Sequence, residues 1–221
     1  CGKTALFNQL TGSRQKVANY AGVTVERKEG TLLTTQGRRV SVLDLPGAYS
    51  FNALSSDEAV TREVITGHSR EALPDLLVCV TDATNLRLHL RMVLEARHLG
   101  LPMVLVLNKM DRVEKLGISI DEDALSRELG VPVVGTISVH AHGTDALRTF
   151  LDRPVEAATA VPWRAPKLEH VLATQREVQR LFQRVVTEPS VDRDQSDRID
   201  RVLMHPVWGF LVLAVVLFIT F

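Results

Sequence analysis

Residues 103–111, MVLVLNKMD, join a short apolar run to a polar loop. The run at 103–107 is typical of a strand buried on both faces of a parallel sheet. In the loop, the carboxylate of Asp111 can accept hydrogen bonds from the N1–H and the exocyclic amine of guanine, a pair of donors that adenine does not offer. Asn108 can reach N7 of the base or brace the loop, and the stem of Lys109 can lie over the ring. The stretch predicts a strand that leads into a guanine-binding loop.

Strands and helices are expected to alternate through the first 150 residues. Further strand-like runs lie at 39–44, 76–80 and 131–137. Residues 86–99 carry apolar side chains near helical spacing, and Gly100 followed by Pro102 is expected to end that helix. This alternation is typical of an α/β domain with a doubly wound sheet.

Gly2, Lys3 and Thr4 precede a helical pattern at the start of the chain. A polyphosphate needs oriented N–H donors, a cation and a magnesium ligand, and these residues could supply backbone amides, an ammonium and a hydroxyl. Alone, the tripeptide is weak evidence. It would be the second half of a phosphate-binding loop, so we expect a sheet that lacks its first strand and weaker GTP binding than in the intact protein.

Three further segments could complete a nucleotide site. Asp44 could hold Mg²⁺ through water and the Gly47 amide could reach the γ-phosphate, with an ordinary strand-to-turn exit as the alternative. Thr24 could complete the magnesium shell, with a β-rich loop residue as the alternative. The loop at 138–140 could offer a backbone amide to the base carbonyl, and it is the least specific of these motifs.

The motifs follow one another in the order that a Ras-like P-loop GTPase requires, so together they predict GTP binding. The predicted nucleotide-contacting residues are Gly2, Lys3, Thr4, Ala5, Gly22, Val23, Thr24, Val25, Asp44, Leu45, Pro46, Gly47, Asn108, Lys109, Met110, Asp111, Ser138, Val139 and His140. Thr4 and Thr24 are predicted to bind Mg²⁺ directly, and Asp44 through water. Ala48 follows Gly47, where Ras-like GTPases place a glutamine that orients the attacking water. We therefore expect slow hydrolysis, unless backbone groups, a monovalent cation or a partner supply the missing element.

The second part of the chain has a different pattern. Residues 151–200 predict a small all-α domain with a solvated charged surface. Its apolar helical face comprises Leu168, Val171, Leu172, Val178, Leu181, Phe182, Val185 and Val186. Residues 206–221, PVWGFLVLAVVLFITF, carry no charge and predict the start of a transmembrane helix within 201–221, although a full span needs roughly 20 residues. Arg198, Arg201 and His205 before this run predict that the preceding domains face the cytoplasm.

The composition excludes several classes of protein and site. Lys and Arg together number 26, as do Asp and Glu, and aromatic residues make up 5%, so a nucleic-acid surface is not indicated. Two cysteines exclude a disulfide framework or a Cys-based metal site and indicate a reduced cytosolic compartment. The seven histidines are scattered without an i, i+4 pair, so we expect no iron site in this chain.

Together these residues resemble the FeoB family of bacterial ferrous iron transporters. The resemblance rests on FNQLTGSRQKVANYAGVTVERKEG, LDLPGAYS, PDLLVCVTDATNLRLHLRMVLEARHLGLP and RVLMHPVWG. It implies a G domain at 1–150, a helical GDP-dissociation-inhibitor-like domain at 151–200 and the start of the first transmembrane helix at 201–221. It also implies that GTP binding and hydrolysis gate or drive Fe²⁺ uptake across the bacterial inner membrane, with this part facing the cytoplasm.

The resemblance assigns roles and partners as well. It implies that Gly2, Lys3 and Thr4 bind phosphates and Mg²⁺, that Thr24 is the switch I threonine, that Asp44 and Gly47 belong to switch II, and that Asn108, Lys109 and Asp111 read guanine. Many relatives carry Met at the position of Lys109, where this chain is nearer to the general GTPase pattern. The implied partners are GTP or GDP, Fe²⁺ as cargo, the lipid bilayer, small accessory Feo proteins and further copies of the chain. K⁺ is an implied activator to which no residue of this chain is assigned.

Two other functions stay open on the sequence. A GTPase of ribosome or tRNA assembly would share the motifs, but such proteins usually append a basic RNA-binding module, whereas this chain appends a neutral helical segment and an apolar run. A regulatory binding module with incidental GTPase activity is the second alternative. Further apolar spans beyond residue 221 would favour the transporter, and a soluble continuation would oppose it.

Overall fold

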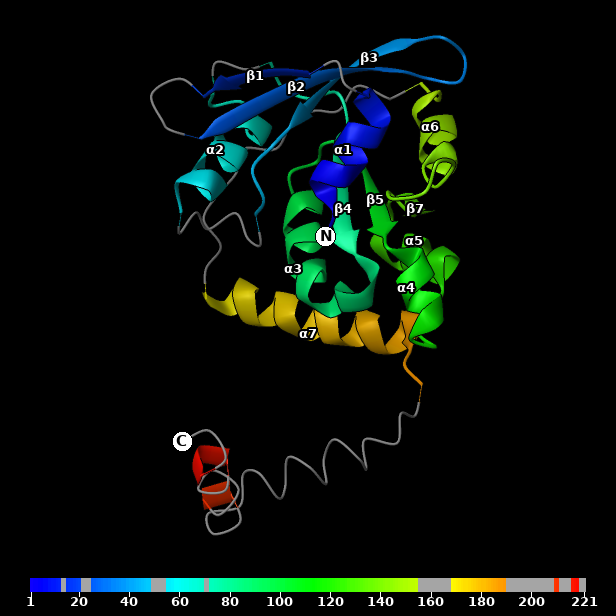
Figure 1. The fold of residues 1–221 in the computed structure, drawn as a ribbon. Coiled ribbons are helices and arrows are strands. Elements are labelled where there is room, and N and C mark those ends of the chain that lie inside the picture. Colours follow the sequence, from blue (N-terminus) through cyan, green and yellow to red (C-terminus); the bar gives the residue numbers. More distant parts are fainter. Residues whose placement is uncertain are drawn as a thin grey trace. The chain divides into compact units, whose positions relative to one another are not determined.

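The computed structural model describes residues 1–12, 15–20, 25–48, 55–69, 72–154, 168–189, 209–210 and 216–218. Two compact units are present, Cys1–Thr187 and Glu188–Phe221, and the first contains all the helices and strands named below (Figure 1). Most of the predicted transmembrane segment at 201–221 lies outside the described residues. Within the described part of the chain, no helix is both long and apolar enough to span a membrane.

The first part of the Cys1–Thr187 unit differs from the expected alternation of strands and helices. Helix α1 (Lys3–Thr11) is followed by three consecutive strands, β1 (Gln15–Asn19), β2 (Glu26–Leu33) and β3 (Arg39–Asp44). They form an antiparallel sheet in the order β1-β2-β3. Helix α2 (Ser56–Ile65) buries Val60 and Val64 against Tyr20 and Val25, which flank the β1–β2 connection.

The second part has the predicted alternation. Strands β4 (Leu77–Asp82), β5 (Met103–Asn108) and β7 (Val133–Thr136) form a parallel sheet in the order β4-β5-β7. The connecting elements are η1 (Ala83–Asn85), α3 (Leu86–Arg97), α4 (Met110–Lys115) and α5 (Glu122–Leu129), and α6 (Asp145–Leu151) follows β7. The strands expected at 39–44, 76–80, 103–107 and 131–137 and the helix expected at 86–99 are confirmed, with ends shifted by two residues or fewer.

The expected single sheet is present as two sheets in the described residues, because β3 and β4 are not hydrogen-bonded neighbours. A shared core nevertheless joins them. Leu32 of β2 and Val106 of β5 belong to one apolar cluster with Leu6 of α1 and Leu147 of α6. Helices α1 and α6 therefore cover one face that both sheets contribute to (Figure 1).

The opposite face of the parallel sheet is covered by α3, α5 and α7 (Leu168–Val185). Leu105 and Leu107 of β5 point into this second cluster, while Val104 and Val106 point into the first. The strand is thus buried on both faces, as its continuous apolar run predicts.

Helix α7 packs against α3 and α5 through an apolar stripe (Figure 1). Val178, Leu181 and Val185 are buried, as expected from the sequence, whereas Leu172 is 46% exposed. The expectation of an all-α domain at 151–200 was wrong in one place, because β8 (Val186–Thr187) pairs with β6 (Ser119–Ile120). A pair of two-residue strands is too short to show in a hydrophobic pattern. The predicted domain boundary at residue 150 stays a prediction.

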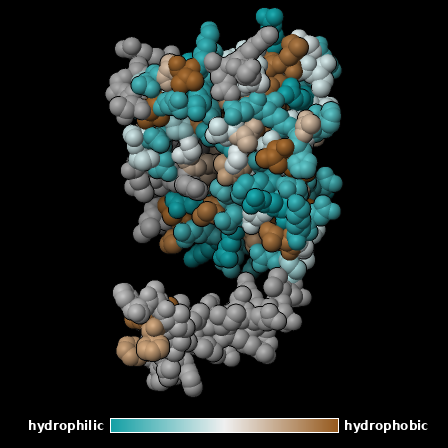
Figure 2. All heavy atoms as spheres, viewed as in Figure 1, coloured by the Kyte–Doolittle hydropathy of each residue, from teal (hydrophilic) through white to brown (hydrophobic). Residues whose placement is uncertain are grey.

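The turn between β2 and β3 is fixed to the end of α6. The backbone N–H of Gln36 donates to Asp152 Oδ1 at 3.2 Å, and the Thr35 hydroxyl donates to Asp152 Oδ2. The Arg38 guanidinium donates to the carbonyl oxygen of Leu151. The visible face of the Cys1–Thr187 unit is predominantly hydrophilic, with small groups of apolar residues scattered over it (Figure 2).

Candidate functional site

The carboxyl ends of the three parallel strands are level with one another. Asp82 of β4 lies opposite Asn108 of β5, and Asn108 lies opposite Thr136 of β7. Ligands of open α/β sheets bind outside this edge of the strands. The loops that leave it carry the predicted site residues at 108–111 and 138–140.

Asn108 is the centre of the hydrogen-bond network at this edge, and it is 2% exposed. Its Oδ1 accepts from the Ser138 N–H at 3.1 Å, from the Ser138 hydroxyl at 2.8 Å and from the Thr136 hydroxyl at 3.2 Å. Its Nδ2 donates to the carbonyl oxygen of Cys1 at 2.9 Å. Of the two roles considered from the sequence, the contacts favour bracing of the loops. One side chain joins the start of α1 to the end of β5 and to the loop after β7.

Gly2 lies against this network at the beginning of α1. Its φ of 79° and ψ of 23° place it in the left-handed region, which glycine adopts without steric cost. A Cβ atom at this position would lie 2.5 Å from Asn108 Nδ2. Thr4 is exposed in the first turn of the helix. The unpaired N–H groups of that first turn are the kind of donor that binds phosphate.

Lys3 and Asp44 form an ion pair across the start of α1 and the end of β3. Lys3 Nζ lies 2.6 Å from Asp44 Oδ1, and it also donates to the carbonyl oxygen of Leu45. The next carbonyl oxygen, of Pro46, accepts from the Thr61 hydroxyl of α2 at 2.9 Å. Lys3, which is predicted to bind phosphate, and Asp44, which is predicted to hold Mg²⁺ through water, therefore lie together. In this structure their charges neutralise each other. Gly47 after them is exposed.

Lys109 is the N-cap residue that precedes α4, with φ 68° and ψ 36°, and in the described part of the chain it is the only residue besides glycine with a positive φ. Its ammonium pairs with Asp82 Oδ2, while Asp82 Oδ1 accepts from the Thr84 N–H at 3.1 Å and from the Thr84 hydroxyl at 2.7 Å. Burial raises the pKa of Asp82, but the bonds from Lys109 and Thr84 outweigh it and hold that pKa below its usual value. In the first turn of α4, which begins at Met110, Asp111 keeps 22% of its side chain exposed and lies 4.0 Å from Lys115 Nζ.

Asp82 is a residue of this edge that the sequence analysis missed. It lies two residues beyond the expected strand at 76–80. A carboxylate at the carboxyl end of a strand is the same signal that marked Asp44, and it could have marked Asp82 as well.

The loop after β7 is held by bonds within the fold. The Ser138 N–H is taken by Asn108, and the His140 N–H donates to the carbonyl oxygen of Ile137 at 3.0 Å. Gln9 of α1 donates to the carbonyl oxygen of His140. Val139 projects at the tip of the loop and is 78% exposed. Two of the amides considered for the base carbonyl are therefore already paired.

The predicted switch segment is only partly described. Gly22, Val23 and Thr24 lie outside the described residues, and Val25 is buried with Tyr20 and Val60. The described residues contain no group of three or more His, Cys, Asp or Glu that could hold a metal ion. Mg²⁺ in nucleotide sites usually takes only one or two protein oxygens besides phosphate and water. The Thr4 hydroxyl and the Asp44 carboxylate fit that kind of site.

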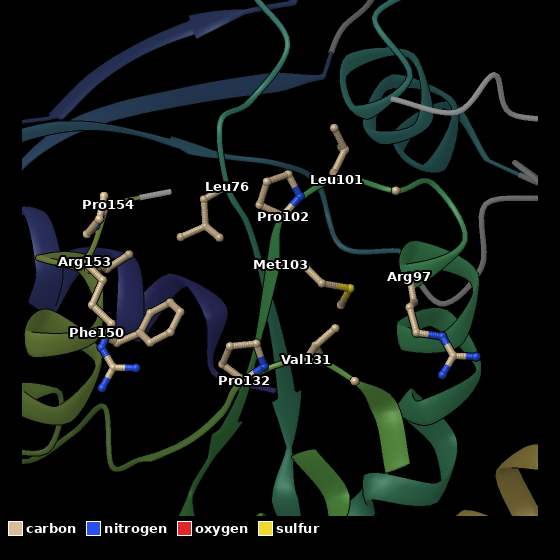
Figure 3. Close-up of a pocket in the computed structure, with 13 residues that line it drawn as sticks. Leu76, Arg97, Leu101, Pro102, Met103, Val131, Pro132, Phe150, Arg153 and Pro154 are labelled. Atoms are coloured by element: carbon tan, nitrogen blue, oxygen red, sulfur yellow. The ribbon is translucent and has the colours of Figure 1, made fainter. Parts of the chain in front are cut away.

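A separate pocket of about 370 Å³ lies at the other end of the parallel strands (Figure 3). Met103 at the start of β5 forms part of its floor, with Arg97 on one side and Phe150 and Arg153 on the other. Arg97 pairs with Glu177 at 3.2 Å, and the Arg153 guanidinium lies 5.5 Å from the centre of the Phe150 ring. None of the predicted nucleotide-contacting residues lines this pocket, so it is not the nucleotide site.

A family model described as "Ferrous iron transport protein B" matches residues 1–151. The chain belongs to the FeoB family. The Fe(2+) transporter FeoB of Salmonella typhimurium is 46% identical over 152 residues, which cover 69% of this chain and 20% of that protein. The Escherichia coli K12 transporter matches with the same identity and coverage. The chain thus spans about a fifth of the length of the curated FeoB relatives it matches.

Solved structures of FeoB cytosolic domains share the fold. The T. maritima domain in a GDP form superposes with a TM-score of 0.72 at 25% identity, covering 84% of this chain and 95% of that one. Its GMPPNP form gives 0.71 at 25% identity, with 85% and 95% covered. The L. pneumophila domain gives 0.72 at 28% identity, with 85% and 96% covered. The chain therefore has the α/β GTPase-like fold of the FeoB G domain, followed by a helical region.

Proposed function

We propose that this chain is the guanine-nucleotide-binding part of a bacterial ferrous iron transporter. The Asn108 network carries the proposal, because it holds the start of α1, the loop at 108–111 and the loop at 138–140 at one edge of the sheet. FeoB structures in GDP and GMPPNP forms support the same class of ligand.

In the nucleotide complex, the Asp111 carboxylate accepts from N1–H and the exocyclic amine of guanine, and the Lys109 stem lies over the ring. The backbone N–H groups of the first turn of α1 and the Lys3 ammonium bind the phosphates. Lys3 must exchange Asp44 for phosphate when the nucleotide enters. That exchange would free the Asp44 carboxylate, which would hold Mg²⁺ through water, while the Thr4 hydroxyl would bind it directly.

Bound Mg²⁺ neutralises charge on the phosphate oxygens. We assign its remaining protein ligand to Thr24 and infer K⁺ as an activator, both on family resemblance. Hydrolysis is slow because the methyl group of Ala48 cannot orient the attacking water. The chain then works as a timing switch: nucleotide binding breaks the Lys3–Asp44 pair, the state of the bound nucleotide moves residues 19–30 and 44–57, and the movement reaches the helical region.

Fe²⁺ is the cargo of the whole transporter, and no residue of this chain is assigned to it. Family membership and the uncharged run at 206–221 support a position on the cytoplasmic side of the bacterial inner membrane, with that run starting the first transmembrane helix. The balance of 26 basic against 26 acidic residues favours this function over a GTPase of RNA assembly. Two experiments test the membrane position and the transport function. The first is flotation with liposomes of a chain extended beyond residue 221, and the second is iron uptake measured with and without GTP hydrolysis.

The central test replaces Asp111 by Asn and measures affinity for GDP, ADP and XDP. The asparagine amide cannot accept from both guanine donors, and it presents an N–H to the C2 carbonyl of xanthine. Loss of two charge-assisted bonds weakens GDP binding by about 100-fold or more, while XDP binding improves. Asp123→Asn is the matched control, because it neutralises an exposed carboxylate of α5 that is not one of the predicted nucleotide-contacting residues. Unchanged GDP affinity in Asp111→Asn would refute the assignment.

A further inference from the structure

We propose that Asp82 is a positioning residue that holds the Lys109 side chain in place for the guanine ring; the inference rests on the proposed guanine-nucleotide function. Asp82 lies at the end of β4, outside the segments that the sequence analysis assigned to nucleotide binding. Its carboxylate bonds to Lys109 across the edge between two neighbouring strands.

The geometry fixes both ends of the Lys109 side chain. Its Cα follows β5, directly after Asn108, and its ammonium reaches Asp82, which lies opposite Asn108 on β4. The four-carbon stem therefore runs along the carboxyl edge of the sheet from β5 toward β4. This is the edge at which Asp111 is placed to accept from the base.

Asp82 is itself held in place. It caps η1 by accepting from the N–H and the hydroxyl of Thr84 through Oδ1, which leaves Oδ2 for Lys109. Only 14% of the Asp82 side chain and 33% of the Lys109 side chain are exposed, so water competes little for the pair. The Asp82 carboxylate is thus held in one position, unlike the carboxylate of an exposed surface ion pair.

The ion pair with Asp82 has two effects on Lys109. A free lysine loses rotamer entropy when it is ordered over a ring, and the ion pair removes much of that loss before the nucleotide arrives. The left-handed backbone at Lys109 is also unfavourable for a residue with a Cβ atom. The ion pair ties this strained residue to β4, and so it helps to keep α4 and Asp111 in position.

The test compares wild type, Asp82→Asn, Lys109→Met and the double variant by titration with a ribose-labelled fluorescent GDP. Asparagine keeps an oxygen for Thr84 but loses the charge that holds Lys109. We expect GDP affinity to fall about fivefold in Asp82→Asn, in line with a partly buried ion pair. In the Lys109→Met background the same change should have no further effect. Competition by inorganic pyrophosphate, which has no base, should be the same in wild type and Asp82→Asn.

Asp121→Asn is the matched control, because Asp121 caps α5 in the same way, accepting from the Ala124 N–H at 2.8 Å, without contacting Lys109. GDP affinity should stay at the wild-type value in this variant. The inference is overturned if Asp82→Asn binds GDP as wild type does, if it weakens GDP equally in the Lys109→Met background, or if pyrophosphate affinity falls in parallel. A wild-type protein that does not prefer GDP to ADP would instead refute the proposed function, and the inference with it.

Discussion

Replacement of Asn108 by alanine removes a hydrogen-bonding centre that is almost fully buried. Three donors lose their acceptor, the N–H and hydroxyl of Ser138 and the hydroxyl of Thr136, and the carbonyl oxygen of Cys1 loses a donor. Each such bond contributes about 1 kcal/mol net, and partial relaxation recovers some of it, so we expect the free energy of unfolding to fall by about 3 kcal/mol. GDP affinity should fall as well, because the loops at 108–111 and 138–140 are no longer tied together.

Urea unfolding at constant m-value measures the first effect, and GDP titration measures the second. Thr136→Val is the matched control, because it removes only the 3.2 Å bond to Asn108 and should cost about 1 kcal/mol. If Asn108→Ala destabilised the protein no more than Thr136→Val does, the four bonds would not act as the network described, and the reasoning would fail.

Three more predictions follow from single residues. Gly2 and Gly130 have similar left-handed backbone angles, with φ, ψ values of 79°, 23° and 67°, 22°, so their replacement by alanine should impose similar strain. Only in Gly2→Ala does the new Cβ atom also collide with Asn108. GDP titration should therefore show weaker binding for Gly2→Ala and not for Gly130→Ala. Burial raises the pKa of Cys79 to about 12. Iodoacetamide at pH 8 should therefore modify only the exposed Cys1 in the native protein, and both thiols in urea. Rapid labelling of Cys79 in the native protein would contradict this prediction. Because bonding lowers the folded-state pKa of Asp82, its contribution to stability is complete above its unfolded pKa of about 4 and is lost as the pH falls through the folded value. The stability difference between wild type and Asp82→Asn should therefore be constant from pH 5 to pH 8 and shrink below about pH 4, as measured by urea unfolding at each pH.

The parallel half of the fold could be predicted from the sequence because its strands are buried on both faces. The run at 103–107 is apolar without interruption, and the same holds for most of 76–80 and 131–137. The antiparallel half could not be predicted in this way. Strands β1 and β2 carry exposed charged residues such as Lys16 and Glu26, so they have no continuous apolar run.

The site residues could be predicted as candidates, but their contacts could not. Local motifs pointed to Asn108 and Asp44, because each follows a strand. The bond from Asn108 to Cys1 and the pair between Lys3 and Asp44 join segments far apart in the chain, and they depend on the packing of α1. The role of Asp82 depends on the register between β4 and β5, which no local pattern encodes.

The hydrogen bonds between the β2–β3 turn and the end of α6 affect how the β2–β3 hairpin can move. Its bonds to Asp152 hold one end of β3, whereas the other end carries Asp44 at the nucleotide edge. If Lys3 releases Asp44, this end of β3 loses its bond to α1, while the turn at the other end stays bonded to Asp152. A displacement of β3 caused by nucleotide binding would therefore be larger at Asp44 than at the turn. Because β2 is hydrogen-bonded to β3, and β1 to β2, such a displacement would be passed on to both strands.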